Sequence, residues 1–113
     1  MCMDISKEDL LRINKGFGGN LRSSSSLDFV FGKLENKRLG LYKKIAYLWG
    51  AILVDHPFSD GNKRTAAFVA YFLADESGKI VDKDLLTHQI ISIAKKNISN
   101  IRNIKQRIKT ILK

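Results

Sequence analysis

Two mostly apolar stretches, separated by one short polar segment, constrain the fold of this chain more than any other feature. The first runs from Leu41 to Val54 without a proline, and the second runs from Ala66 to Ala74. A helix that is hydrophobic on most of its faces is normally buried inside a protein. The pattern therefore predicts two central helices joined by a polar loop.

Proline and glycine mark the expected ends of these two helices. Pro57 disfavours the α conformation for the residue before it, so the first helix should end just before His56. Helical character resumes after Gly61, and Gly78 is expected at the C-terminal cap of the second helix. The imidazole of His56 is thus predicted to lie on the loop between the helices.

Further amphipathic helices are expected on both sides of this pair. Ser6 precedes Glu8 and Asp9 as an N-cap does, and Gly16 should end this first helix. Another helix should start at Asp82. The tail has the periodicity of a surface-packed helix, with apolar residues every three or four positions at Ile98, Ile101, Ile104, Ile108 and Ile111.

Two segments keep alternative interpretations. Residues 27–34 combine β-favouring side chains with leucines at helical spacing, so a helix and a strand both fit. Glycine and serine dominate from Gly16 to Ser26, which indicates a loop. This loop is either a flap over a binding site, in the form of a short β-hairpin, or an ordinary connection. Without linker or repeat, residues 1–113 are expected to form a single domain, a compact all-α helical bundle.

The composition is typical of a soluble cytoplasmic protein without a membrane span. The lone Cys2 cannot form a disulfide within the chain, and no apolar run approaches the roughly 18 residues of a membrane-spanning helix. The formal net charge of +9 arises from a basic excess after Asp84. Such a tail suits an acidic protein partner. Nucleic acid is a less favoured partner, and a non-catalytic module that binds RNA or an acidic protein is kept as an alternative function.

The polar segment from His56 to Arg64 has the residues of a phosphate site. The first N–H groups of a helix have no partner within it, and its dipole favours an anion there. Gly61 allows a ligand to approach this backbone closely. Lys63 and Arg64 place two cations in the same turn, where only a bound anion offsets their unfavourable interaction with the dipole.

Two side chains of this segment add reaction chemistry. Asp60 is a hard oxygen ligand, which suits a Mg²⁺ ion that also contacts phosphates. His56 is the residue type that accepts a proton near neutral pH. Phe58 is interpreted as an apolar anchor that holds the loop on the core. Taken singly, each residue also has a structural interpretation, such as helix capping for Asp60 or a turn for Asn62.

The contiguous sequence His56-Pro57-Phe58-Ser59-Asp60-Gly61-Asn62-Lys63-Arg64-Thr65-Ala66 closely resembles the signature of the Fic/Doc family. The resemblance implies the helical Fic fold and ATP as the co-substrate. It also implies that His56 is the general base for a target hydroxyl, of Ser, Thr or Tyr, and that Asp60 holds Mg²⁺. The nucleotide phosphates would then be received by Gly61, Asn62, Lys63 and Arg64.

Two positions bear on the branch of the family. AMP-transferring members usually have a glycine where Lys63 stands and a second arginine where Ala67 stands. With Lys63, the segment is similar to the Doc toxin branch of the family. This resemblance implies transfer of the terminal phosphate of ATP to a translation elongation factor. AMP transfer is the alternative. The inhibitory motif of many relatives is missing, because Phe31 occupies its hydroxyl position before Glu35-Asn36, and an antitoxin supplied in trans is expected instead.

Overall fold

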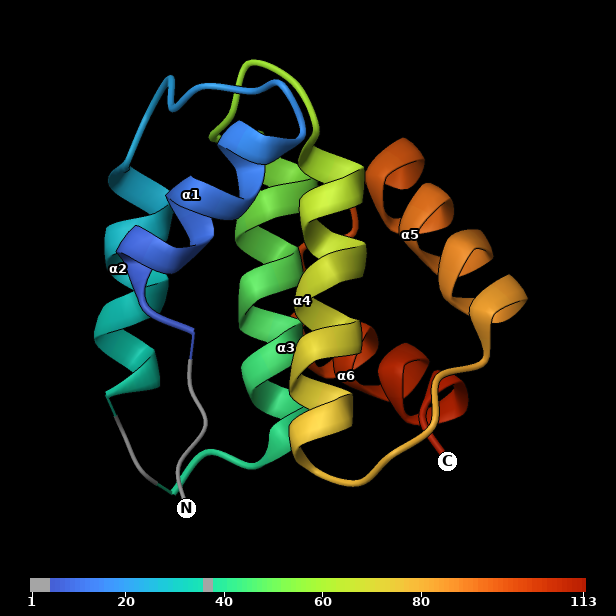
Figure 1. Cartoon of the computed structure of the whole chain (residues 1–113). Helices are drawn as coiled ribbons and strands as arrows, with labels where there is room; N and C mark the ends of the chain where they lie inside the picture. The colour runs from blue at the N-terminus through green and yellow to red at the C-terminus, as the bar shows by residue number, and fades with distance from the viewer. Residues whose placement is uncertain (1–4, 36–37) are drawn as a thin grey trace.

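The computed structural model describes residues 5–35 and 38–113; Cys2 and Asn36 lie outside them. Within the described residues the all-α prediction is confirmed (Figure 1). The helices are α1 (Lys7–Gly16), α2 (Ser25–Leu34), α3 (Leu41–Trp49), α4 (Asn62–Glu76), α5 (Lys83–Lys96) and α6 (Ile101–Ile111). In these residues no helix is long and apolar enough to cross a membrane.

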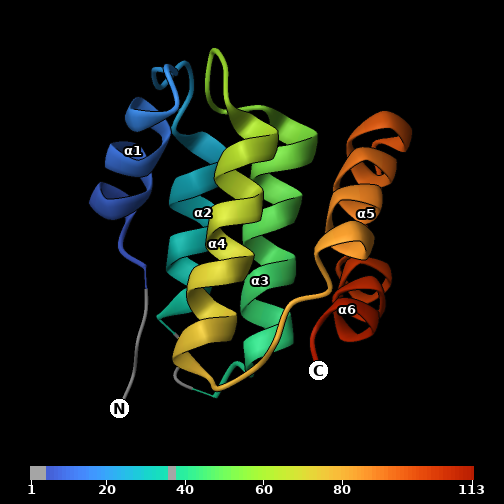
Figure 2. The same cartoon turned by 45° about the vertical axis from the view of Figure 1, so that its right-hand side comes forward.

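The two apolar stretches form the central helix pair, as predicted. Helices α3 and α4 run side by side through the middle of the molecule, with α1 and α2 on one flank and α5 and α6 on the other (Figures 1 and 2). The indole N–H of Trp49 on α3 donates a hydrogen bond of 2.9 Å to the carbonyl oxygen of Ala66 on α4, and both residues are fully buried. This bond satisfies the only polar atom of the Trp49 side chain inside the core.

The first central helix ends differently from the prediction of one continuous helix through Val54. After Trp49 it continues as a π-helical turn, η1 (Gly50–Val54), which ends close to His56. Gly50, which starts this turn, has a low intrinsic preference for the α conformation. Apolar periodicity cannot distinguish a π turn from the last turn of an α-helix. Such turns are frequent at functional sites.

The N-terminal helix has the predicted cap. The Ser6 hydroxyl accepts a hydrogen bond from the backbone N–H of Asp9, and the Asp9 carboxylate accepts one from the backbone N–H of Ser6. Hydrogen bonds from the Ser6 backbone and then its side chain lower the pKa of Asp9. The ambiguous segment after the loop is helical, since it forms α2, with Leu27 and Val30 buried.

The C-terminal helices also agree with the sequence. Asp82 caps α5, and Gly78 has a positive φ of 71° directly after the C-cap of α4. Helix α6 buries Ile104, Ile108 and Ile111, and lies against α3. The end of the chain is held by two backbone hydrogen bonds between Ile80 and Lys113, of 2.8 and 2.9 Å.

The expectation of a short β-hairpin flap is wrong for the described residues. Helix α1 extends through Gly16 and α2 begins at Ser25, which leaves only residues 17–24 for the connection. Most hydrogen bonds of this connection join it to the loop between η1 and α4. They include an isolated antiparallel bridge between Leu21 and Phe58. The segment is therefore one side of a two-loop contact. Residues 17–24 are called the brace loop below.

Replacement of Trp49 by phenylalanine tests the contact between the central helices. The change removes the donor to Ala66 and leaves unfilled space in the core, so unfolding should become easier by about 2 kcal/mol. Trp49 is the only tryptophan, so its replacement removes the tryptophan fluorescence signal. Urea denaturation is therefore followed by far-UV circular dichroism. The control is Tyr71→Phe, at a side chain that is 38% exposed. Equal stability of Trp49→Phe and the unmodified protein would contradict this assignment.

Candidate functional site

The predicted site residues meet in one cavity at the start of α4. This cavity has a volume of about 330 Å³ and is polar, and it is lined by the loop between η1 and α4, by the first turn of α4 and by Phe17. Its walls are formed by Phe17, His56, Ser59, Asp60, Gly61, Asn62, Lys63 and Arg64. Its size is at the small end of ligand pockets, enough for a polyphosphate chain with the rest of a nucleotide lying outside.

The N-terminus of α4 has the features of an anion site. Gly61 is its N-cap, with a left-handed φ of 73°, and no side chain caps the helix. A Cβ atom at Gly61 would lie 3.2 Å from both Asn14 Nδ2 and Phe17 Cβ, so a larger residue would be both strained and crowded. The uncapped N–H groups at the start of α4, with the exposed Lys63 and Arg64, favour a phosphate ligand.

Asp60 does not cap the helix, in contrast to the structural alternative. Its Oδ1 accepts a hydrogen bond of 2.7 Å from the adjacent N–H of Gly61, which fixes the carboxylate at the edge of the cavity. The described residues contain no group of three or more His, Cys, Asp or Glu that would hold a metal ion. A single carboxylate fits Mg²⁺, which is often bound by one or two carboxylates together with substrate phosphates and water.

Asn62 and Phe58 build the loop. The Asn62 side-chain amide donates to the Phe58 carbonyl oxygen at 3.0 Å, and its oxygen accepts from the Phe58 N–H at 3.3 Å. The side chain is thus committed to the loop, and the contribution of Asn62 to a phosphate would come from its backbone. Phe58 is 1% exposed and lies in the hydrophobic core.

The brace loop holds the loop that carries His56. Pro57 cannot donate a hydrogen bond, but its carbonyl oxygen accepts from the N–H groups of Arg22 and Ser23 at 2.7 and 3.2 Å. Arg22 Nη2 also donates to the carbonyl oxygen of His56 at 3.1 Å. His56 has a φ of 49°, a left-handed value that is costly for a residue with a side chain and needs such support.

Asn14 is a site residue that sequence reasoning missed. It lies on α1 and is 1% exposed, and its Nδ2 donates to the Asp60 carbonyl oxygen at 2.8 Å and to Thr65 Oγ1 at 3.1 Å. One side chain therefore joins the backbone of Asp60 to the first turn of α4. A signal was present, because Asn14 stands four residues after the buried Leu10, on the apolar face of its helix.

Gly19 fits against the same contact. An added Cβ atom would collide with Asn14 Oδ1 and with the Asp60 carbonyl oxygen. The brace loop can approach Asp60 only because this residue has no side chain. By contrast, His88 and Trp49 do not line the cavity.

Loss of the Asn14 amide should destabilise the site. In Asn14→Ala the Asp60 carbonyl oxygen and the buried Thr65 hydroxyl lose their donor, and we expect a loss of about 1–3 kcal/mol in the free energy of unfolding. The matched control is Asn20→Ala, since Asn20 is exposed and bonds to Ser59 through its backbone. Hydrogen exchange of the Asp60 to Thr65 amides would report the local loosening. Equal protection in both variants would show that Asn14 does not hold the loop.

Comparison with known proteins identifies the family of the chain. A model of the Fic/DOC family matches residues 4–74, which include α1, the brace loop, both central helices and the whole signature segment. The curated proteins and the solved structures compared with the chain contain no match. Members of this family typically use ATP, with Mg²⁺, to transfer a phosphoryl or nucleotidyl group to a protein. Since the match covers more than half of the sequence, the chain belongs to the Fic/Doc family.

Proposed function

We propose that this protein transfers the γ-phosphate of ATP to a hydroxyl group of a target protein in the cytoplasm. The observation that carries the proposal is the single cavity that collects His56, Asp60 and the uncapped start of α4 with Lys63 and Arg64. These are a proton acceptor, a carboxylate for Mg²⁺ and a cradle for phosphates. Phosphoryl transfer depends mostly on positioning and charge stabilisation, so few groups are enough.

In the proposed reaction His56 removes the proton from the target hydroxyl while its oxygen attacks the γ-phosphorus. The bond from that phosphorus to the bridging oxygen breaks, ADP leaves with the bond electrons, and the phosphate ester forms. The backbone N–H groups at the start of α4, with Lys63 and Arg64, hold the phosphates and balance the developing charge. Mg²⁺, bound by Asp60, would neutralise phosphate charge.

The choice of phosphate over AMP rests on two residues of α4. Lys63 is exposed at the mouth of the cavity, where AMP-transferring relatives usually have glycine. Ala67 is partly buried against the core and provides no cation at the position of their second arginine. Transfer of AMP therefore lacks one of its usual phosphate contacts and stays the second candidate.

The proposals for the target and for the inhibitor rest on the resemblance to Doc toxins. The target is a Ser, Thr or Tyr hydroxyl of a protein, with a translation elongation factor as first choice. Leu21 of the brace loop is 41% exposed next to the signature loop and offers an apolar contact for a target segment. Inhibition would come from an antitoxin chain supplied in trans.

Labelled ATP distinguishes the two reactions. The protein is incubated with Mg²⁺, a cell extract, purified elongation factors and ATP labelled at the α or at the γ phosphate. We expect label from the γ position only, and a loss of about 10²- to 10⁴-fold in His56→Ala because its base is removed. His88→Ala, at the only other histidine and exposed on α5, should keep full activity. Label from the α position would replace phosphorylation by AMP transfer.

The role of Asp60 is tested by the magnesium requirement. Asp60→Asn keeps an oxygen that can accept from the Gly61 N–H but removes the charge that binds the ion. We expect half-maximal rate at a Mg²⁺ concentration at least tenfold higher than in the unmodified protein. Asp75→Asn, at an exposed aspartate near the other end of α4, is the control. An unchanged magnesium dependence in Asp60→Asn would exclude this carboxylate as the ligand.

A further inference from the structure

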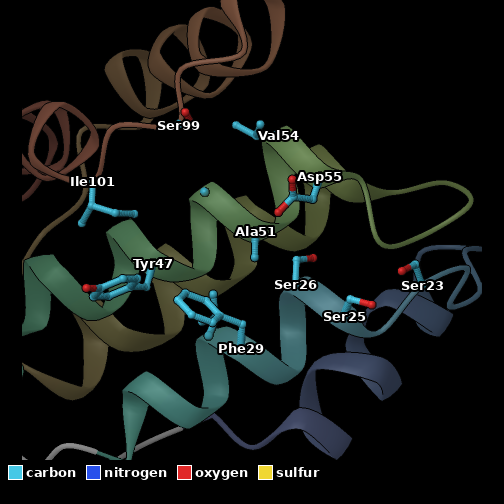
Figure 3. Close-up of a pocket in the computed structure, with 12 residues that line it drawn as sticks. Ser23, Ser25, Ser26, Phe29, Tyr47, Ala51, Val54, Asp55, Ser99 and Ile101 are labelled. Carbon is cyan, nitrogen blue, oxygen red and sulfur yellow. The ribbon is translucent and has the colours of Figure 1, made fainter.

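A second and larger cavity lies on another face of the central helix. Its volume is about 630 Å³, and it is lined by α2, by the α3–η1 helix and by the residues that lead into α6. Figure 3 shows the rings of Phe29 and Tyr47 beside one another in this space, with Ile101 and Ser99 on its far side. Phe29 is 62% exposed, which is unusual for a large apolar side chain beside a cavity.

The cavity is one end of a longer groove along α3 and η1. Lys43, Tyr47, Ala51 and Val54 recur every three or four residues and form one stripe of this helix. Tyr47 and Ile101 line both the apolar cavity and an adjoining hollow of about 380 Å³. The groove therefore continues from the apolar cavity into the adjoining hollow, whose lining includes charged side chains.

The second part is strongly basic. The adjoining hollow contains Lys43, Arg102 and Lys105, and the next hollow shares Lys43 and Lys105 and adds Lys109. The ion pairs of Lys7 with Asp28 and of Arg12 with Asp9 include none of these four cations. At the opposite end the groove has Asp55 and several serines. Charge thus runs from negative through apolar to positive.

The geometry points to an acidic amphipathic helix of a partner protein as the occupant of this groove. Apolar side chains of such a helix would contact Phe29, Tyr47 and Val54, and its carboxylates would lie over Lys43, Arg102 and Lys105. The inference goes beyond the proposed transfer reaction and does not depend on it, because no residue of the signature cavity lines the groove.

The walls of the groove explain why the occupant is a helix. The walls are mostly helices, α2, α3 with η1, and α6, whose backbone N–H and C=O groups bond within each helix. They offer no strand edge to an extended peptide, so the occupant must satisfy its own backbone. Lys43 and Asp55 lie about 18 Å apart along the helix axis, at about 1.5 Å per residue, and an occupant of about 12 helical residues spans this length.

RNA is the competing ligand, since an exposed aromatic ring beside cations also suits a single strand. Two features favour protein. Asp55 at one end would repel a phosphate backbone, and the apolar part is lined by Val30, Ala51, Val54 and Ile101, which match aliphatic side chains better than bases. The Phe29 ring also has the Lys33 ammonium 5.3 Å from its centroid, which adds a further cation on this wall.

A peptide library tests the groove. A phage-displayed library of 16-residue random peptides is selected on the unmodified full chain, and bound peptides are measured by fluorescence polarisation. We expect acidic sequences with apolar residues at spacings of three or four. Their affinity should fall at least tenfold in Phe29→Asp and in Lys43→Glu, both at exposed side chains whose replacement spares the core.

Matched controls separate this surface from general stickiness and from the active site. Ile80→Asp changes an apolar side chain that is 75% exposed elsewhere, and Lys95→Glu removes a cation on α5. Both should bind the peptides normally, as should His56→Ala, so a failed transferase would not affect the result. The proposal is overturned if no peptide is enriched, or if enriched peptides bind Phe29→Asp and Lys43→Glu as tightly as they bind the unmodified protein. It is also overturned if a 12-nucleotide single-stranded RNA binds more tightly than any peptide and loses this binding in Phe29→Asp, since RNA would then be the ligand of the groove.

Discussion

The loop between the two central helices must satisfy its own backbone while it leaves the start of α4 open to a ligand. A buried backbone polar group without a partner is costly, and most connecting loops solve this by contact with water. Here the partners come from other segments: the brace loop bonds to His56, Pro57 and Ser59, and Asn14 bonds to Asp60. The first N–H groups of α4 keep no side-chain cap. Other segments thus supply the hydrogen bonds of the loop, while the start of α4 stays available to a ligand.

The arrangement explains why α1 and the brace loop belong to the site although they carry no predicted reactive residue. Without them His56 would not be held at a positive φ, and the Asp60 carbonyl would lose its donor. Strain of this kind persists only where the surroundings impose it. The family match over residues 4–74 includes these supporting elements together with the central helices. The unit that builds the site is therefore larger than its signature segment.

The two faces of the central helix divide the work. Trp49 and its neighbours face α4 and fix the helix pair, while Tyr47, two residues earlier, faces the groove together with Lys43. The groove ends at Asp55, immediately before His56 in the chain, and Ser23 lines it while bonding to Pro57. A partner in the groove would thus lie next to the supports of the site. The same helix leads into the proposed active site at one end and presents the proposed docking surface along its side.

The sequence by itself determined the helices other than the one over residues 27–34, most of their ends, and most of the residues that line the signature cavity. Helix positions and ends were predicted from apolar periodicity and from the cap residues Ser6, Gly78 and Asp82, which depend only on nearby sequence. The signature from His56 to Arg64 is contiguous, so its chemistry could be predicted without knowledge of the fold. Only the tertiary structure decided that residues 27–34 form a helix, that Gly50–Val54 is a π turn, and that the Asn62 side chain holds the loop. It also decided that Asn14, 46 residues before Asp60, supports that residue. The Asn14 contact and the packing of α2 on α3 and η1 join segments far apart in the chain, which no local pattern encodes.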